Sequence, residues 1–225
     1  METTMDMFKL PADRFVVIYH GVNPNFRPVP REEARQRLSE ALGVRVPYIL
    51  YVGNVQRRKN LVRLLEAFHI FRQETRLDIK LALSGGRDYD TGFVGEAIER
   101  HQLKEHVLEL GPVPDIHMPD LYSAAEMLAF PTLWEGFGFP VVEAMACGTP
   151  VLTSNVSSLP EVAGEAALLV DPHNVEEISA GMCRIMTDSA LRARLSEKGI
   201  ERARTFTWAR CQCQTLQALK GLVGL

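Results

Sequence analysis

The sequence predicts an α/β protein, a Rossmann-like parallel sheet sandwiched between helices. Apolar segments of strand length alternate six or seven times with segments of helical spacing, a pattern typical of a parallel sheet covered on both faces. The 225 residues are 46% hydrophobic and 24% charged, which is ordinary for a globular protein able to bury a good core. No G-x-G-x-x-G motif follows the first predicted strand, so a dinucleotide-binding fold is not expected.

Composition also argues against several classes of partner. A net charge of −3 disfavours nucleic acid or an anionic membrane surface as the main partner. No apolar run approaches the ~20 residues needed to span a bilayer, and the acidic N-terminus has no signal-peptide core. The cysteine spacing fits neither a disulfide framework nor a zinc site, so reduced thiols in a cytoplasmic protein are expected. These cysteines are Cys147, Cys183, Cys211 and Cys213.

The first quarter of the chain predicts two strands and two helices after a lead-in of residues 1–14. Phe15–Tyr19 is β-rich and apolar and is predicted to be a buried strand. Pro30–Gly43 predicts a helix that begins with acidic residues and stops at a glycine. Tyr48–Val52 predicts the next buried strand, and apolar residues at helical spacing predict a helix over Leu61–Glu74.

The loop between Gly53 and Asn60 is the first feature with chemical potential. Arg57, Arg58 and Lys59 end at a helix start, where the helix dipole disfavours positive charge. A bound anion would relieve this conflict, and local conflicts of this kind often mark function. Solvated surface cations are the alternative.

Two further strand–loop–helix units follow. Ile79–Leu83 predicts a strand followed by Gly85, where the backbone can approach a ligand closely or simply turn without one. Phe93–Leu103 predicts a helix, Val107–Leu110 a strand, and Met118–Ala125 a short helix.

The segment from Met127 to Thr153 is the most informative stretch. A strand over Met127–Phe130 runs into a glycine-containing loop, and Pro140 suits the first turn of the helix that follows. Glycines before a helix start allow close approach, while free N–H groups and the helix dipole favour an anion such as phosphate. Gly148 is expected to end this helix, and a strand begins at Val151.

Two carboxylates stand in this stretch. Glu143 lies one turn into an otherwise apolar helix, where an unpaired buried carboxylate would be costly. It is suited to pair with the two hydroxyls of a ribose. Glu135 is expected at the mouth of the loop, free to meet a second polyhydroxyl group. The alternative is an ordinary helix start with two solvated glutamates.

The remaining residues predict one strand and three helices. Ser157 and Ser158 open a short segment after the strand that starts at Val151, and they could serve as ordinary N-cap residues. Ala167–Val170 predicts the last strand. The three closing helices are predicted over residues 175–187, 190–203 and 208–222.

The motif E-G-F-G-F-P-V-V-E-A-M-A-C-G-T-P-V, residues 135–151, resembles the E-x7-E signature of family 4 retaining glycosyltransferases of the GT-B fold. The resemblance extends over nearly the whole chain but covers only the C-terminal, donor-binding half of such an enzyme. It implies that residues 15–205 form a nucleotide-sugar-binding domain, one half of a GT-B fold.

The resemblance implies roles for particular residues. Gly53–Asn60 is similar to the family's G-x-x-x-x-R-K-N loop, so Lys59 and Arg58 would hold the donor diphosphate. Many members have an arginine directly after the glycine where this chain has Asn54, which leaves open whether Arg57 or Arg58 supplies the second charge. Catalytic roles are thus expected for Glu135, Lys59 and Arg58. The expected donor-binding residues are Glu143, Gly136, Phe137, Gly138, Phe139, Val113, Gly85, Gly53 and Ser158.

The implied reaction transfers a hexose from a nucleoside-diphosphate sugar to a hydroxyl acceptor with retention. The cations and the helix start after Gly138 would stabilise the leaving diphosphate; no D-x-D motif stands in a suitable loop, and no metal or cofactor is expected. The R-K-N-L and E-G-F-G-F-P segments are similar to those of the mannosyltransferase-like branch, which favours GDP-mannose over UDP-linked sugars.

Family members take acceptor contacts from an N-terminal domain of similar size. Phe206–Trp208 is similar to the F-[ST]-W step before the family's final helix, so residues 206–225 are expected to pack toward a missing N-terminal domain or partner chain. We expect the isolated chain to bind nucleotide weakly and transfer little, with peripheral membrane association limited to a full enzyme. The alternatives are a non-catalytic nucleotide-sugar-binding module that needs a partner and an epimerase that needs no acceptor.

Overall fold

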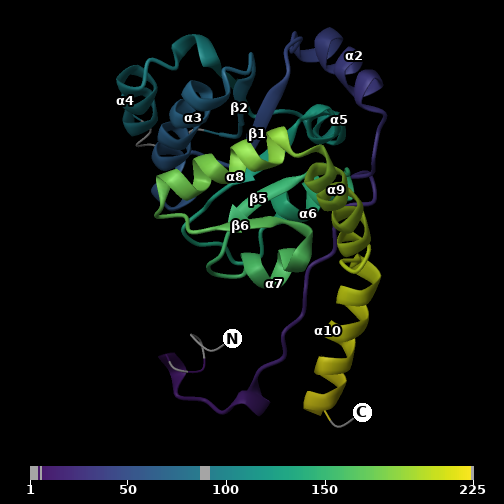
Figure 1. Ribbon diagram of the computed structural model, residues 1–225. Coiled ribbons are helices and arrows are strands. Elements are labelled where there is room, and N and C mark those ends of the chain that lie inside the picture. The colour runs from purple at the N-terminus through teal and green to yellow at the C-terminus, as the bar shows by residue number, and fades with distance from the viewer. Residues whose placement is uncertain (1–4, 6, 87–91, 224–225) are drawn as a thin grey trace.

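Six parallel strands form one sheet in the computed structural model, which describes residues 5, 7–86 and 92–223 (Figure 1). The predicted fold class is therefore confirmed. The strand order is β3-β2-β1-β4-β5-β6, and every adjacent pair is parallel. The strands are β1 Tyr48–Val52, β2 Lys80–Ser84, β3 Val107–Gly111, β4 Met127–Phe130, β5 Val151–Ser154 and β6 Leu168–Val170.

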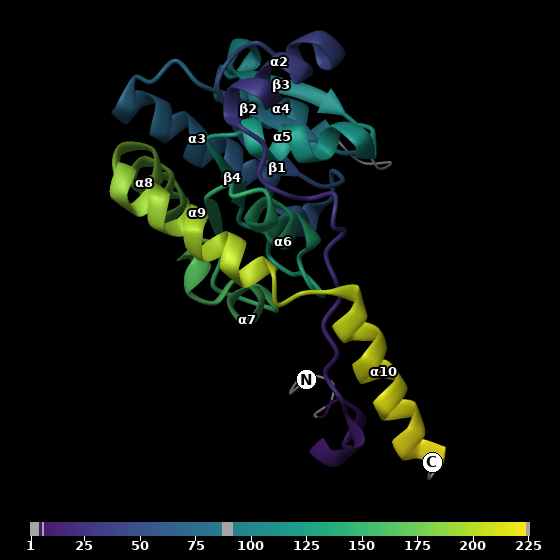
Figure 2. The ribbon, with the colours of Figure 1, turned by 90° about the vertical axis from the view of Figure 1, so that its right-hand side faces the viewer.

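Helices cover both faces of the sheet. Figure 2 shows α3 and α8 on one side of the strands and α5 and α6 on the other. The α-helices are α2 Arg31–Leu42, α3 Leu61–Thr75, α4 Gly92–Arg100, α5 Met118–Ala124, α6 Phe139–Ala146, α7 Leu159–Ala163, α8 Val175–Thr187, α9 Ser189–Ala203 and α10 Trp208–Val223. The predicted helix stop at Gly43 is confirmed, because this residue caps α2 with a φ of 70°.

The core lies between the sheet and these helices. The apolar residues that predicted α3 by their spacing are all at most 1% exposed. The central strands are buried on both faces, with Ile49, Leu50 and Leu128 at 0% exposure. This is why they are continuous apolar runs rather than alternating ones.

The sheet reverses its winding between β1 and β4. The chain passes from β1 to β2 on one side of this pair and from β4 to β5 on the other. The loops that leave the carboxyl ends of β1 and β4 therefore turn toward opposite faces of the sheet. Ligands of open α/β sheets bind at such a switch point.

The prediction of a buried strand over Phe15–Tyr19 is wrong. The segment is extended but pairs with no strand among the described residues, and Val16 and Val17 are 66% and 46% exposed. Its β-forming residues find no sheet edge because the segment leaves the body of the protein (Figure 1). Its end is anchored to the body of the protein: the Tyr19 ring packs 5.7 Å from that of Phe206.

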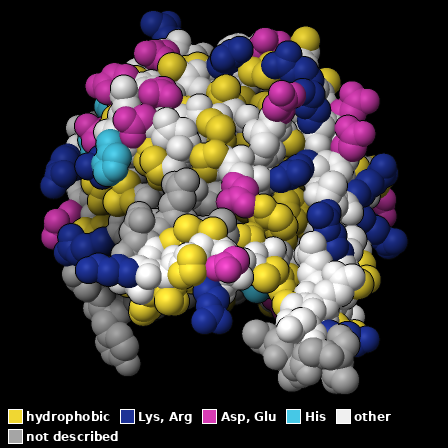
Figure 3. Space-filling view, turned by 90° about the horizontal axis from the view of Figure 1, so that it is seen from below, with side chains coloured by type: hydrophobic (Ala, Val, Ile, Leu, Met, Phe, Trp, Pro, Cys, Tyr) yellow, Lys and Arg dark blue, Asp and Glu magenta, His cyan; other side chains and the backbone are white. Residues whose placement is uncertain are grey.

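The N-terminal segment, residues 7–20, and α10 project from the same end of the molecule (Figures 1 and 2). Hydrophobic side chains are exposed among charged ones on the face seen from this end (Figure 3). Leu216 and Leu219 of α10 are each 55% exposed. The expectation that residues 206–225 pack toward another domain stays a prediction, as does the division at residues 14 and 205; residues 1–4, 6 and 224–225 lie outside the described part. None of the described helices is long and apolar enough to cross a membrane.

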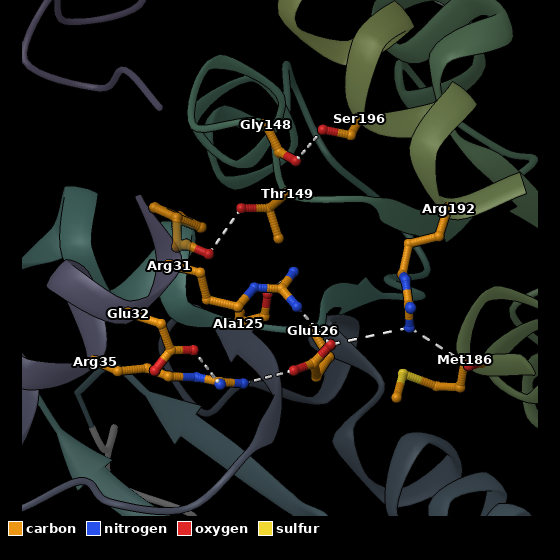
Figure 4. A network of polar contacts seen from close by, with 11 residues as sticks. Arg31, Glu32, Arg35, Ala125, Glu126, Gly148, Thr149, Met186, Arg192 and Ser196 are labelled. Atoms are coloured by element: carbon orange, nitrogen blue, oxygen red, sulfur yellow. Dashed lines mark hydrogen bonds and ion pairs between the residues drawn. The ribbon is translucent and has the colours of Figure 1, made fainter. Parts of the chain in front are cut away.

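A buried carboxylate ties the helices to the amino end of the sheet (Figure 4). Glu126, directly before β4, is 9% exposed and accepts hydrogen bonds of 2.8 Å from Arg31 Nη1 and 2.8 Å from Arg35 Nη2. Arg192 Nη1 of α9 lies 4.0 Å from the same carboxylate. Glu126 thus joins α2, β4 and α9 at the edge opposite the switch-point loops.

Replacing Glu126 by glutamine should therefore destabilise the fold. We expect the free energy of unfolding to fall by about 1–3 kcal/mol, less than for a fully buried pair because the arginines are partly exposed. Urea denaturation followed by circular dichroism measures this. Glu165→Gln is the matched control, since its ion pair with Lys198 is on the surface, and it should change stability little. Equal effects of the two variants would contradict the role given to Glu126.

Candidate functional site

The loops after β1 and β4 are joined to each other at the switch point. The Leu133 N–H donates to the Arg58 carbonyl at 2.8 Å. Asn60 Nδ2 donates to the carbonyls of Pro131 at 2.8 Å and Pro172 at 2.7 Å. Asn60 has a φ of 60°, which asparagine tolerates better than most residues. The two loops therefore form one unit that positions their side chains.

An ion pair lies at the centre of this unit. Lys59 Nζ donates to Glu135 Oε1 at 2.5 Å, and Arg58 Nη1 reaches the same oxygen at 3.2 Å. The side chains of Lys59 and Glu135 are each 10% exposed, whereas that of Arg58 is 42% exposed. Lys59 Nζ also lies 5.0 Å from the centroid of the Phe130 ring, a cation–π contact. The structure thus brings together the three residues for which catalytic roles are expected.

Glu135 is not a solvated side chain at the loop mouth, and its contact with a polyhydroxyl group stays a prediction. Its side chain is buried against Lys59, because a carboxylate at this depth needs a partner and the lysine supplies one. Lys59 and Arg58 both donate to Oε1 of Glu135, and no described residue donates to Oε2. Oε2 is therefore available to another donor. Two residues 76 positions apart in sequence form this pair, so spacing could not reveal it.

Two serines fix the backbone of the Glu135 loop. Ser157 Oγ accepts from the Glu135 N–H at 3.0 Å and donates to the Glu135 carbonyl. Ser158 Oγ donates to the carbonyls of Glu135 at 3.0 Å and Phe137 at 3.2 Å. Ser158 is at the N-cap position of α7, yet its side chain makes no capping hydrogen bond. The serine therefore serves the loop rather than the helix start.

Gly138 sets the start of α6. Its φ is 99°, and a Cβ there would lie 2.7 Å from Leu159 Cδ2, so both conformation and space require glycine. Pro140 stands in the first turn, as predicted. Gly136 has open space where a Cβ would be, Phe137 is buried and Phe139 is 38% exposed. Residues 136–138 thus lead directly into the N-terminus of α6.

Glu143 has the partner that its burial demands. Tyr122 Oη, from α5, donates to Glu143 Oε2 at 2.7 Å. Burial raises the pKa of Glu143 above its ordinary value, the nearby Asp115 adds to this, and the Tyr122 hydrogen bond opposes it. Among the described residues, none donates to the other oxygen, Oε1. Tyr122 belongs to no recognisable sequence motif, so the sequence does not predict its contact with Glu143.

A hollow of about 410 Å³ lies at the carboxyl ends of β1, β2 and β3, lined in part by Gly53, Gly85 and Gly111. Gly85 has a φ of 145°, and a Cβ there would lie 2.2 Å from the Gly53 carbonyl oxygen. The close approach that this glycine allows is therefore between two loops of the chain itself. Val113 lies two residues beyond Gly111 and is half-buried.

The structure separates the two arginines between which the sequence left a choice. Arg58 lies beside Lys59 at Glu135, whereas the Arg57 guanidinium lies 5.1 Å from the Phe93 ring centroid. Asn54 Oδ1 accepts from the Gly86 N–H at 3.0 Å and so braces the neighbouring loop. By position, Arg58 is the cation that accompanies Lys59.

A second hollow, of about 950 Å³, lies between the N-terminal segment and the Glu135 loop. His20 lines it together with Glu135 and Gly136. The His20 ring is stacked 5.3 Å from that of Phe139 and packs edge-on against Phe137 at 5.3 Å. Within the described residues, no cluster of three or more potential metal ligands is present; independence from metal stays a prediction.

The chain matches a known protein family. The family model described as glycosyl transferases group 1 matches residues 32–202. The O-antigen chain mannosyltransferase B of Escherichia coli is 37% identical over 214 residues, 95% of this chain and 56% of that protein. A D-inositol 3-phosphate glycosyltransferase of Thermobispora bispora is 31% identical over 221 residues, 91% of this chain and 50% of that protein. The chain spans about half the length of the curated relatives it matches.

Solved structures with the same fold lead to the same family. Sucrose-phosphate synthase from Thermosynechococcus elongatus is 29% identical with a TM-score of 0.83, over 99% of this chain and 56% of that one. The C-terminal domain of LpcC, a group 1 glycosyl transferase family protein from Francisella tularensis, shares the fold at 22% identity with a TM-score of 0.69, over 80% of this chain and 94% of that one. The chain therefore belongs to the group 1 glycosyl transferases.

Proposed function

We propose that this chain is the donor-binding half of a glycosyltransferase that moves a hexose from a nucleoside-diphosphate sugar to a hydroxyl acceptor with retention. The observation that carries the proposal is the convergence of Lys59, Arg58 and Glu135 at the switch point of the sheet. Two cations on adjacent residues suit the two phosphates of such a donor. The switch point is where an open α/β sheet binds its ligands.

Each group has a chemical task in this proposal. Lys59 and Arg58 hold the diphosphate and stabilise the charge that develops on it as the glycosidic bond breaks. The N-terminus of α6, with residues 136–138 before it, adds N–H groups and its dipole. Glu143 accepts from the ribose hydroxyls through its free oxygen. Glu135 both orients Lys59 and offers Oε2 to the hydroxyls of the donor sugar.

Mannose is the sugar we favour, with GDP-mannose as donor. The support comes from relatives: the 37% identical mannosyltransferase B and, at 29% identity, the serotype-specific mannosyltransferase WbdA of Escherichia coli. The Anabaena protein HepE, whose structure was solved with UDP and glucose, shares the fold at 21% identity and a TM-score of 0.83. UDP-linked sugars are therefore the alternative that a binding assay must include.

We further propose that acceptor contacts come from an N-terminal domain or partner chain. The apolar residues exposed on the N-terminal segment and α10 suit packing against such a unit. The four cysteines are all free, which fits a reducing compartment such as the cytoplasm.

Replacing Lys59 by alanine should weaken nucleotide binding. Loss of a charge-assisted contact to phosphate is expected to raise the Kd for GDP or UDP by about 10- to 100-fold, as isothermal titration calorimetry can measure. Lys198→Ala is the control, because Lys198 pairs with Glu165 on the surface. If the wild-type chain binds GDP or UDP and Lys59→Ala binds equally well, the proposed diphosphate site is wrong.

Replacing Glu143 by glutamine should separate binding from stability. Because its pKa is raised in the folded protein, the folded state holds its proton more tightly than the unfolded state, and this group lowers stability as pH rises above about 4.5. At pH 7 the glutamine variant should therefore be at least as stable as wild type in thermal unfolding, and should bind nucleotide about tenfold more weakly. A variant that loses stability but binds normally would mark Glu143 as structural.

A further inference from the structure

Two tyrosines of β1 are buried alike but differ in their hydrogen bonding. Tyr48 and Tyr51 are each 1% exposed. Tyr48 Oη donates to the Leu121 carbonyl at 2.7 Å. Tyr51 Oη has no hydrogen-bond partner among the described residues. A buried hydroxyl without a partner lowers stability, so its presence calls for a use.

The position of Tyr51 indicates that use. Tyr51 lines the hollow of about 410 Å³ at the ends of β1, β2 and β3. The point that a Cβ on Gly53 would occupy lies 3.0 Å from the Tyr51 hydroxyl and 3.6 Å from Lys59 Cε. The glycine thus leaves the hydroxyl and the lysine stem as neighbours at the end of the strand.

Tyr51 and Lys59 also share a second neighbour. The Tyr51 ring lies 6.0 Å from the ring of Phe130, and Lys59 Nζ lies over that same ring at 5.0 Å. The tyrosine is therefore part of the packing around the Lys59–Glu135 pair. Burial raises the pKa of Tyr51, which keeps its hydroxyl protonated and able to donate.

We propose that the Tyr51 hydroxyl donates a hydrogen bond to a phosphate oxygen of a nucleoside diphosphate bound beside Lys59, at the end of β1. The proposal rests on the proposed function, in which Lys59 holds the same diphosphate. A hydrogen bond to an ionised acceptor is stronger than one between neutral groups, so a single hydroxyl here makes a measurable contribution. Tyr51 would then be a donor-binding residue with no counterpart in the motifs of the sequence.

The test compares Tyr51→Phe with Tyr48→Phe, which remove one hydroxyl each from the same strand. Calorimetric titration with GDP, UDP and inorganic pyrophosphate measures binding, and thermal unfolding measures stability. We expect Tyr51→Phe to raise the Kd for GDP or UDP by about tenfold and to weaken pyrophosphate as well. Its Tm should be unchanged or higher, because no hydrogen bond within the protein is lost.

Tyr48→Phe should behave in the opposite way. It leaves the Leu121 carbonyl without its donor, so the Tm should fall by about 2–4 °C while nucleotide binding stays unchanged. The inference is overturned if Tyr51→Phe binds nucleotide as wild type does, if it loses stability as Tyr48→Phe does, or if pyrophosphate binding is unaffected.

The Lys59→Ala variant distinguishes failure of the proposed diphosphate site from failure of the proposed role of Tyr51. If it weakens nucleotide binding and Tyr51→Phe does not, the diphosphate site stands and only the role of Tyr51 fails. If the wild-type chain binds none of the three probes, the proposed function fails and the inference about Tyr51 fails with it.

Discussion

The parallel direction of all six strands is the constraint on which the rest of the molecule depends. It places every strand's carboxyl end at one edge, and the winding reverses there between β1 and β4, at the switch point where open α/β sheets bind ligands. Backbone polar groups at the switch point must find partners, and Asn60 supplies two of them by bridging to the loops after β4 and β6. Asn60 therefore joins these loops at the carboxyl edge of the sheet, and the site is located by the sheet rather than by any one motif.

The switch-point loops bring Lys59 and Glu135 together as a largely buried ion pair. Removing two charges from water is costly, and their mutual attraction offsets that cost only when the geometry is good. Here Arg58 and the Phe130 ring add favourable contacts to the pair. In the proposed function, this pairing fixes the two cations in place before a phosphate binds, which is electrostatic preorganisation. Glu126 and its arginines hold the opposite edge, where stability can be concentrated away from the site.

Much of the fold could be predicted from the sequence, because local pattern and tertiary burial agree there. The apolar runs of β1 and β4 and the spacing of Leu61 to Phe71 each correspond to one observed element. Phe15–Tyr19 has the same composition as a buried strand, and it is not one because it pairs with no strand in the described part of the chain. The positions of Glu143 and Gly138 could also be predicted, since helix geometry fixes them locally. The burial of Glu135, the loop-bracing serines and the orphaned Tyr51 hydroxyl depend on contacts between distant residues, which spacing does not contain.

A crystal structure of this chain with GDP or UDP tests the central claim most directly, which is that the diphosphate binds where the β1 and β4 loops meet. The account predicts phosphate oxygens about 2.7–3.2 Å from Lys59 Nζ and from a nitrogen of Arg58, with the ribose hydroxyls at Glu143. A nucleotide bound elsewhere, with Lys59 still paired to Glu135 and no phosphate near it, would contradict the account.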